Sequence, residues 1–191
     1  MTHSVPDGVW PILATPFQDD GAVDFAALDQ LVAFYVDTGV SGLFALGSSS
    51  ECLTLLPRER LEIVRRAVEV SDGRLPIVAV ANYGKSLDAQ GTSLSEYAEL
   101  GIAAAVVSTS ILPKPTNLDK QLLRLGDMTD PPLGVYECPI PEKRVLTPRE
   151  TQRVAASGRY VMMKDTCRDM SAFRVKVELS QGTPLKIFQA N

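Results

Sequence analysis

The sequence predicts a protein of the α/β class built around a parallel sheet. Short apolar runs alternate with amphipathic helical patterns along the whole chain, and the runs lack the polar alternation of a half-exposed strand. The pattern leaves two layouts open, a closed (β/α) barrel and an open, doubly wound sheet. Neither G-x-G-x-x-G nor G-x-x-x-x-G-K-[ST] follows an expected strand, which weighs against a nucleotide-binding sheet.

The first half of the chain predicts three strand–helix repeats. Asp24 can cap a helix whose apolar residues recur at helical spacing, and Gly39 ends that helix. Asp72 and Gly73 break the next helix, which begins near Pro57. The expected strands cover 9–14, 42–46 and 76–80, and the expected helices cover 24–39, 57–72 and 86–100.

The second half continues the alternation with four more strands. Thr147, Pro148 and Glu150 form the pattern of a capping box with proline at the first helical position. The expected strands cover 104–107, 134–136, 160–164 and 186–189, and the expected helices cover 118–125, 147–156 and 169–179. With no linker and no low-complexity segment, we expect one domain over residues 1–191.

A barrel layout would be truncated after strand seven. A (β/α)₈ barrel usually needs about 250 residues, and this sequence has 191. Strand eight and the closing helices would then be absent from the sequence. An open barrel of seven strands exposes two unpaired edges, so we expect the isolated 191-residue polypeptide to be poorly soluble or molten.

Composition excludes several classes of function. A net charge of −4 with no run of Lys or Arg argues against nucleic acid as a partner. No apolar stretch reaches about 18 residues and no signal peptide is evident, so we expect a cytoplasmic protein with no membrane partner. Cys52, Cys138 and Cys167 form no C-x-x-C pair, which suits a reducing compartment. His3 is the only histidine, which removes His-dependent triads and multi-His metal sites.

Three polar sites stand at the ends of expected strands, where parallel α/β folds gather their function. Lys164 closes an apolar run, and a buried strand end would lower its pKa and free its amine to attack a ketone. Tyr136 closes the neighbouring strand and could shuttle protons. Ser48 and Ser49 could hold a carboxylate. The plainer alternatives are a lysine that reaches solvent, a core tyrosine and an ordinary polar turn.

The ordered set of these segments resembles the dihydrodipicolinate synthase / N-acetylneuraminate lyase family of Schiff-base aldolases. Residues 47–51 (GSSSE) are similar to the family's G-[ST]-[ST]-G-E, residues 136–139 (YECP) to Y-N-x-P, and residues 163–165 (MKD) to [IM]-K-[DE]. Residues 15–17 (TPF) also match. No single motif is specific, but together they cover essentially the whole chain in the right order.

The resemblance implies a TIM barrel that forms a homotetramer or dimer and needs no metal or organic cofactor. It implies that pyruvate or a related 2-keto acid binds Lys164 as an imine, with Tyr136 as the proton shuttle. Ser48 and Ser49 would hold the keto-acid carboxylate, and Thr15 would join them in binding substrate. The reaction would be an aldol cleavage, a condensation or a dehydration.

The chain departs from the family pattern at several positions. Serine replaces a glycine, glutamate replaces the asparagine of Y-N-x-P, and apolar residues stand where synthases and lyases carry tyrosines: Ser50, Glu137, Ile111 and Leu112. The arginine with which synthases bind the second substrate falls near Pro141, and Lys143 or Arg144 could substitute for it. We therefore expect a substrate other than that of a true dihydrodipicolinate synthase.

Two alternatives remain open. The chain could be a non-catalytic relative that binds a small acid or serves as a scaffold, which the altered loop near Ile111 favours. It could also be an unrelated α/β binding protein, which would require a doubly wound topology.

Overall fold

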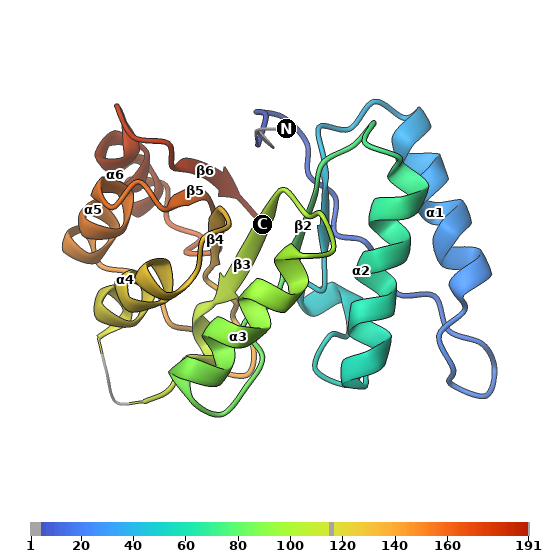
Figure 1. The fold of residues 1–191 in the computed structure, drawn as a ribbon. Coiled ribbons are helices and arrows are strands. Elements are labelled where there is room, and N and C mark those ends of the chain that lie inside the picture. Colours follow the sequence, from blue (N-terminus) through green and yellow to red (C-terminus); the bar gives the residue numbers. More distant parts are fainter. Residues whose placement is uncertain (1–4, 115–116, 191) are drawn as a thin grey trace. The chain divides into compact units, whose positions relative to one another are not determined.

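A computed structural model describes residues 5–114 and 117–190, and these residues divide into two compact units (Figure 1). Unit 1 comprises the described residues up to Val80 together with Tyr97–Ala103. Unit 2 comprises Ala81–Glu96 and the described residues from Ala104 onward. The expectation of a single barrel domain over residues 1–191 stays a prediction.

Unit 1 contains a parallel strand pair with two helices. Leu43 pairs with Ile77 and Ala45 with Ala79, and the two helices lie side by side (Figure 1). Its elements are α1 (Phe25–Asp37), β1 (Leu43–Ala45), the 3₁₀ turn η1 (Ser48–Ser50), α2 (Pro57–Ser71) and β2 (Ile77–Val80).

The helix expected after Asp24 forms for the expected reason. The Asp24 carboxylate accepts the Ala27 backbone N–H at 2.9 Å, which satisfies one of the donors left open at a helix start. Leu28 and Val32 are fully buried one turn apart. The capping residue and the buried apolar face therefore indicate the same helix. The expected bounds, 24–39, lie within two residues of those of α1.

The first expected strand, 9–14, is reduced to a single parallel bridge between Ile12 and Phe44. Leu13 donates its N–H to the Phe44 carbonyl, and Phe44 donates to the Pro11 carbonyl, both at 2.9 Å. Pro11 has no N–H to extend the ladder, and the partner strand is only three residues long. The described residues contain six strands, so an ending after strand seven is not confirmed.

Unit 2 holds a parallel sheet whose strands β3, β4, β5 and β6 pair in sequence order. Helices α4, α5 and α6 lie next to one another beside it (Figure 1). Most of α3 also belongs to this unit. The elements are α3 (Leu87–Ala98), β3 (Ala104–Ser108), η2 (Thr109–Ile111), α4 (Leu118–Met128), β4 (Leu133–Tyr136), α5 (Pro148–Ala156), β5 (Tyr160–Asp165), α6 (Met170–Ser180) and β6 (Lys186–Gln189).

Strand register sets which side chains meet in unit 2. Ser108 pairs with Tyr136, and Tyr136 pairs with Lys164. Paired residues of a parallel sheet point to the same face, and each following residue points to the opposite face. Tyr136 and Lys164 therefore share one face, while Glu137 and Asp165 face the other.

Close packing of side chains from the two neighbouring strands accounts for a glycine in β4. A Cβ atom on Gly134 would lie 2.8 Å from Met162 Cγ and 3.0 Å from Val106 Cγ2. The first contact is shorter than real Cβ atoms show and the second is tighter than most of them, so Met162 and Val106 pack closely over position 134 because it has no side chain.

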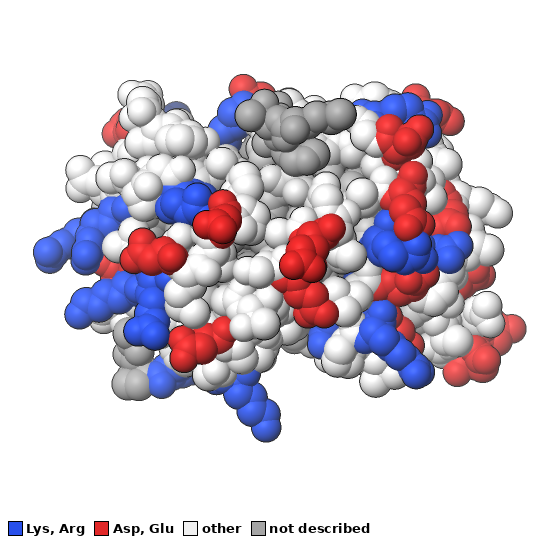
Figure 2. All heavy atoms as spheres, viewed as in Figure 1, with Lys and Arg blue, Asp and Glu red and all other residues white. Residues whose placement is uncertain are grey.

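Charges of both signs are interspersed on the face drawn in Figure 2. Within unit 1, Arg65 forms an ion pair with Glu62, and Arg66 forms one with Asp29. Within the described part of the chain, none of the helices is long and apolar enough to cross a bilayer.

Candidate active site

Lys164 and Tyr136 come together at the carboxyl ends of β5 and β4. The Lys164 Nζ atom lies 4.4 Å from the centre of the Tyr136 ring, within cation–π range. Tyr136 is only 2% exposed, and Lys164 is half-buried. The side chain of Lys164 therefore turns toward the phenol instead of extending freely into solvent.

The surroundings of Lys164 favour a reactive amine. Burial disfavours the charged ammonium and lowers the pKa of Lys164 from about 10.5 to about 8, while the nearby Cys138 acts in the opposite direction. This confirms the expectation that the strand end lowers the pKa of the lysine. A lysine in this state carries a useful fraction of free amine near neutral pH, as a nucleophile toward a ketone requires.

The serine loop of unit 1 forms the 3₁₀ turn η1 after β1. Gly47 precedes the turn in extended conformation, and Glu51 closes it at φ 56°. Ser48 is half-buried, Ser49 is exposed and Ser50 is fully buried. Of the three serines, Ser48 and Ser49 are thus the two whose side chains are exposed or partly exposed.

Thr15 and Ser50 fasten this loop to the segment that precedes α1. The Thr15 hydroxyl donates to the Ser50 carbonyl at 2.8 Å, and the Ser50 hydroxyl donates to the Leu13 carbonyl at 2.5 Å. Ser50 is thus a structural residue where a glycine was expected. The hydroxyl of Thr15 already has a backbone partner, which gives it a supporting position beside Ser48 and Ser49.

The candidate residues therefore form two groups, each within one unit. Thr15, Ser48 and Ser49 lie in unit 1, whereas Tyr136 and Lys164 lie together in unit 2. The meeting of the serine loop with the lysine stays a prediction.

Sequence reasoning missed a buried charge cluster on the opposite face of the same two strands. The Lys176 ammonium donates to Glu137 Oε2 and to Asp165 Oδ2, each at 2.6 Å. All three side chains are at most 4% exposed. Glu137 also accepts the Leu146 N–H at 2.8 Å, so its second oxygen is satisfied.

The pKa directions in this cluster follow from burial and pairing. Burial raises the pKa of Glu137, which the positive Lys176 only partly offsets. Burial would lower the pKa of Lys176, but the two carboxylates outweigh it and raise that pKa. Burial also opposes ionisation of Asp165, yet hydrogen bonds from Cys167 and Lys176 lower its pKa. The available signal in the sequence was strand alternation, because Glu137 and Asp165 directly follow Tyr136 and Lys164.

The loop after β3 is held by backbone contacts. Leu112 is buried and Ile111 is half-buried. The Thr109 hydroxyl lies 2.7 Å from the Arg144 carbonyl, and the Arg144 guanidinium donates to the Leu112 carbonyl at 2.7 Å. Arg144 thus joins the loops after β3 and β4.

Lys143 makes a similar connection to the loop after β5. Its ammonium donates to the Thr166 carbonyl at 2.6 Å. Lys143 and Arg144 therefore both bind backbone carbonyls in this structure, although the sequence suggested them as ligands for a second substrate's carboxylate.

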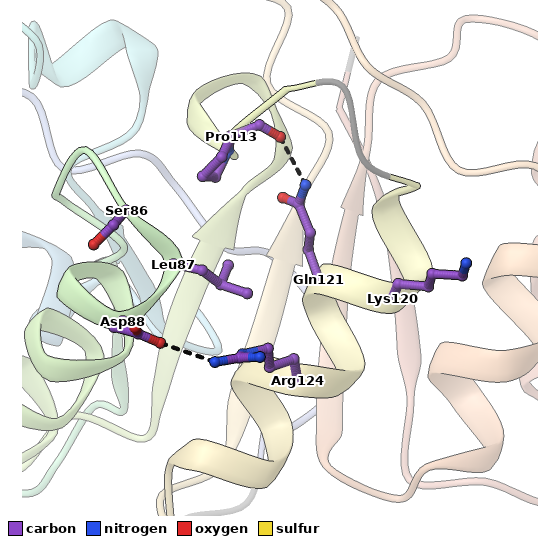
Figure 3. Close-up of a pocket in the computed structure, with 7 residues that line it drawn as sticks. All are labelled: Ser86, Leu87, Asp88, Pro113, Lys120, Gln121 and Arg124. Atoms are coloured by element: carbon purple, nitrogen blue, oxygen red, sulfur yellow. Dashed lines mark hydrogen bonds and ion pairs between the residues drawn. The ribbon is translucent and has the colours of Figure 1, made fainter.

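A separate hollow of about 470 Å³ lies between the start of α3 and α4 (Figure 3). Arg124 pairs with Asp88 at 3.2 Å across it, and the Gln121 amide donates to the Pro113 carbonyl. It shares no lining residue with the Lys164–Tyr136 pair. Among the residues that the structure describes, no group of three His, Cys, Asp or Glu side chains could hold a metal ion.

Comparison with known proteins gives one consistent family. Residues 5–187 match the Dihydrodipicolinate synthetase family. A 4-hydroxy-tetrahydrodipicolinate synthase from Gluconacetobacter diazotrophicus is 30% identical over 161 residues, which cover 83% of this chain and 54% of that protein. The corresponding synthase from Koribacter versatilis is 34% identical over 69% of this chain and 45% of its own. The chain thus spans about half the length of the curated relatives it matches.

Solved structures agree on the fold. A monomeric dihydrodipicolinate synthase variant superposes with a TM-score of 0.89 at 24% identity, covering 100% of this chain and 65% of that one. The dihydrodipicolinate synthase of Thermotoga maritima superposes with a TM-score of 0.87 at 25% identity, covering 98% of this chain and 64% of that one. A prophage protein of the same family from E. coli K12, in complex with pyruvate, superposes with a TM-score of 0.85 at 25% identity. This match covers 96% of this chain and 63% of that one. The α/β fold is that of the matching part of these proteins.

Proposed function

Because the chain belongs to the dihydrodipicolinate synthetase family, we propose that it is a Schiff-base lyase acting on pyruvate or another 2-keto acid. The observation that carries the proposal is the half-buried Lys164 amine, with a pKa near 8, placed 4.4 Å from the Tyr136 ring. The related E. coli protein in complex with pyruvate supports the choice of keto acid.

The proposed chemistry begins with attack of the neutral Lys164 amine on the ketone carbon. The carbinolamine that forms gains a proton on its hydroxyl and loses water, which leaves an iminium ion. The iminium draws electrons from the adjacent C–H bond, and loss of that proton gives an enamine that can attack an aldehyde. In the cleavage direction, the iminium of the aldol adduct breaks its C–C bond, which releases the aldehyde and leaves the same enamine. Tyr136, which faces the lysine, is the proposed carrier of these protons, and no metal or organic cofactor takes part.

Substrate binding is assigned to the serine loop. Ser48 and Ser49 would donate hydrogen bonds to the keto-acid carboxylate, helped by the backbone N–H groups of η1. Thr15 supports the loop through its bond to the Ser50 carbonyl. In this proposal the protein is a cytoplasmic homo-oligomer, a dimer or a tetramer.

The second substrate is proposed to differ from that of the relatives named synthases. Ile111 and Leu112 offer no hydroxyl where the family's tyrosines stand, and Leu112 is buried. Lys143 and Arg144 bind backbone carbonyls in the structure, so neither offers a preformed carboxylate site. A sugar acid or another 2-keto acid that needs no such cation suits the site better.

A second candidate is a non-catalytic relative that binds a small acid. Ile111 and Leu112 favour it, because these two residues carry no hydroxyl at the positions where the family's tyrosines would complete a proton relay. Such a protein would bind pyruvate without forming an imine or turning over any keto acid.

Imine trapping separates the two. Borohydride reduction in the presence of pyruvate should add the mass of the reduced adduct to the peptide containing Lys164 in the wild type, and none in Lys164→Ala. Mass on another lysine, or pyruvate binding without any adduct, would reject the lyase. A panel of 2-keto acids read by the same trapping then orders the substrates.

A further inference from the structure

The buried cluster of Glu137, Asp165 and Lys176 takes no part in the proposed reaction. It nevertheless joins β4 and β5, the two strands that hold the proposed catalytic residues. Lys176 on α6 contacts a carboxylate from the end of β4 and one from the end of β5, both at 2.6 Å. No other ionic contact that the structure describes is as deeply buried on all its members.

The position of the cluster follows from strand alternation. Glu137 is one residue beyond Tyr136, and Asp165 is one residue beyond Lys164. Since successive side chains point to opposite faces, the cluster fixes the strand ends from one face while the phenol and amine meet on the other. The Glu137 N–H donates to the Lys164 carbonyl at 3.2 Å, so the two strands stay paired at this level.

The cluster also matches a change in the sequence. Glu137 stands where the family pattern has a neutral asparagine. The glutamate places a charged carboxylate in a buried position, where it needs a partner of opposite charge. Lys176 supplies that partner and binds Asp165 at the same time. The two carboxylates are thereby drawn to one ammonium across the gap between the strands.

We propose that Lys176 is a positioning residue, which sets the approach of the Tyr136 phenol to the Lys164 amine by clamping Glu137 and Asp165 together. This inference rests on the proposed function only for its kinetic test. When Lys176 is removed, the ends of β4 and β5 should separate. The Tyr136 phenol then loses its position for proton transfer, and water reaches the Lys164 amine.

The kinetic test is a double-mutant cycle on the exchange of pyruvate methyl protons in D₂O. Exchange needs the imine and the proton transfer but no second substrate, and NMR follows it at saturating pyruvate. Lys176→Met should slow exchange at least tenfold in the wild-type background. In the Tyr136→Phe background it should have little further effect, because the phenol through which Lys176 acts is already gone.

A second readout needs no substrate at all. The rate at which acetic anhydride acylates Lys164 should rise with pH around a midpoint near 8 in the wild type, and this midpoint should move upward in Lys176→Met as water reaches the amine. Lys120→Met removes an exposed lysine from α4 and should change neither readout. Circular dichroism establishes that each variant is folded.

Glu137→Gln is the substitute if Lys176→Met does not fold. This variant keeps the ion pair of Asp165 with Lys176 and removes only the charged contact to β4. We therefore expect pyruvate proton exchange to slow by a smaller factor than in Lys176→Met, with the same non-additivity toward Tyr136→Phe. Equal slowing in both tyrosine backgrounds together with an unmoved midpoint would overturn the positioning role. If the wild type shows no exchange, the proposed lyase fails, and the acylation midpoint alone then decides the positioning role.

Discussion

The pKa of Lys164 makes a quantitative prediction about the reactivity of its amine. With a pKa of about 8, about 9% of the amine is free at pH 7, against about 0.03% for a lysine at 10.5. Acylation of Lys164 should therefore rise about fivefold from pH 7 to pH 8 and less than twofold from pH 8 to pH 9. A lysine of ordinary pKa would gain about tenfold at each step.

Competitive labelling with trace acetic anhydride measures this directly. Mass spectrometry of the peptide that carries Lys164 gives the rate, and added Nα-acetyl-lysine corrects for the pH dependence of the reagent. Tenfold gains at both steps would refute the argument that burial shifts this amine. Such a result would also remove the main support for imine formation near neutral pH.

The same shift has a consequence for folding with a definite sign. The folded-state pKa of about 8 lies below the unfolded value of about 10.5, so the unfolded chain binds the proton more readily between these values. The cost of burying Lys164 is therefore fully present below pH 8 and disappears as the pH rises to about 10.5. Lys164→Met should melt higher than the wild type at pH 7, and this advantage should shrink as the pH is raised.

Three further predictions concern other residues. Tyr136→Phe should keep the imine but slow pyruvate proton exchange by about 10²–10⁴-fold, because general acid–base catalysis contributes that much; unchanged exchange would deny the phenol its role. Thr147→Ala removes the hydroxyl that caps the Glu150 N–H at 3.3 Å and should lower the free energy of unfolding by about 1 kcal/mol, measured by urea titration. Gly134→Ala should cost about 1–3 kcal/mol by overpacking against Met162, and an unchanged urea midpoint would contradict the close packing of Met162 over Gly134.

Most helices and strands were predictable because their signals are local. The cap at Asp24 and the capping box at Thr147 and Glu150 each specify a helix start through hydrogen bonds within four residues. The pairing of Tyr136 with Lys164 was also predictable, since both residues end apolar runs that follow one another in a parallel sheet.

The parts that were not predictable depend on contacts distant in sequence. The strand at 9–14 was overestimated, because its length depends on β1 and on the missing N–H of Pro11. Glu137 was recognised only as a departure from a pattern. Its partner Lys176 lies 39 positions further along, and nothing in the local sequence of α6 distinguishes that lysine from a solvated one.

The alternation along β4 and β5 makes the length of these strands as important as their composition. A single residue inserted or deleted before Tyr136 or Lys164 would turn the strand over, because side-chain direction repeats every two residues. After a deletion before Lys164, for example, the amine would point at helix α6 and the Asp165 carboxylate would take its former place. We therefore expect this part of the protein to tolerate many substitutions but no change in residue count, which an insertion scan with a folding reporter can measure.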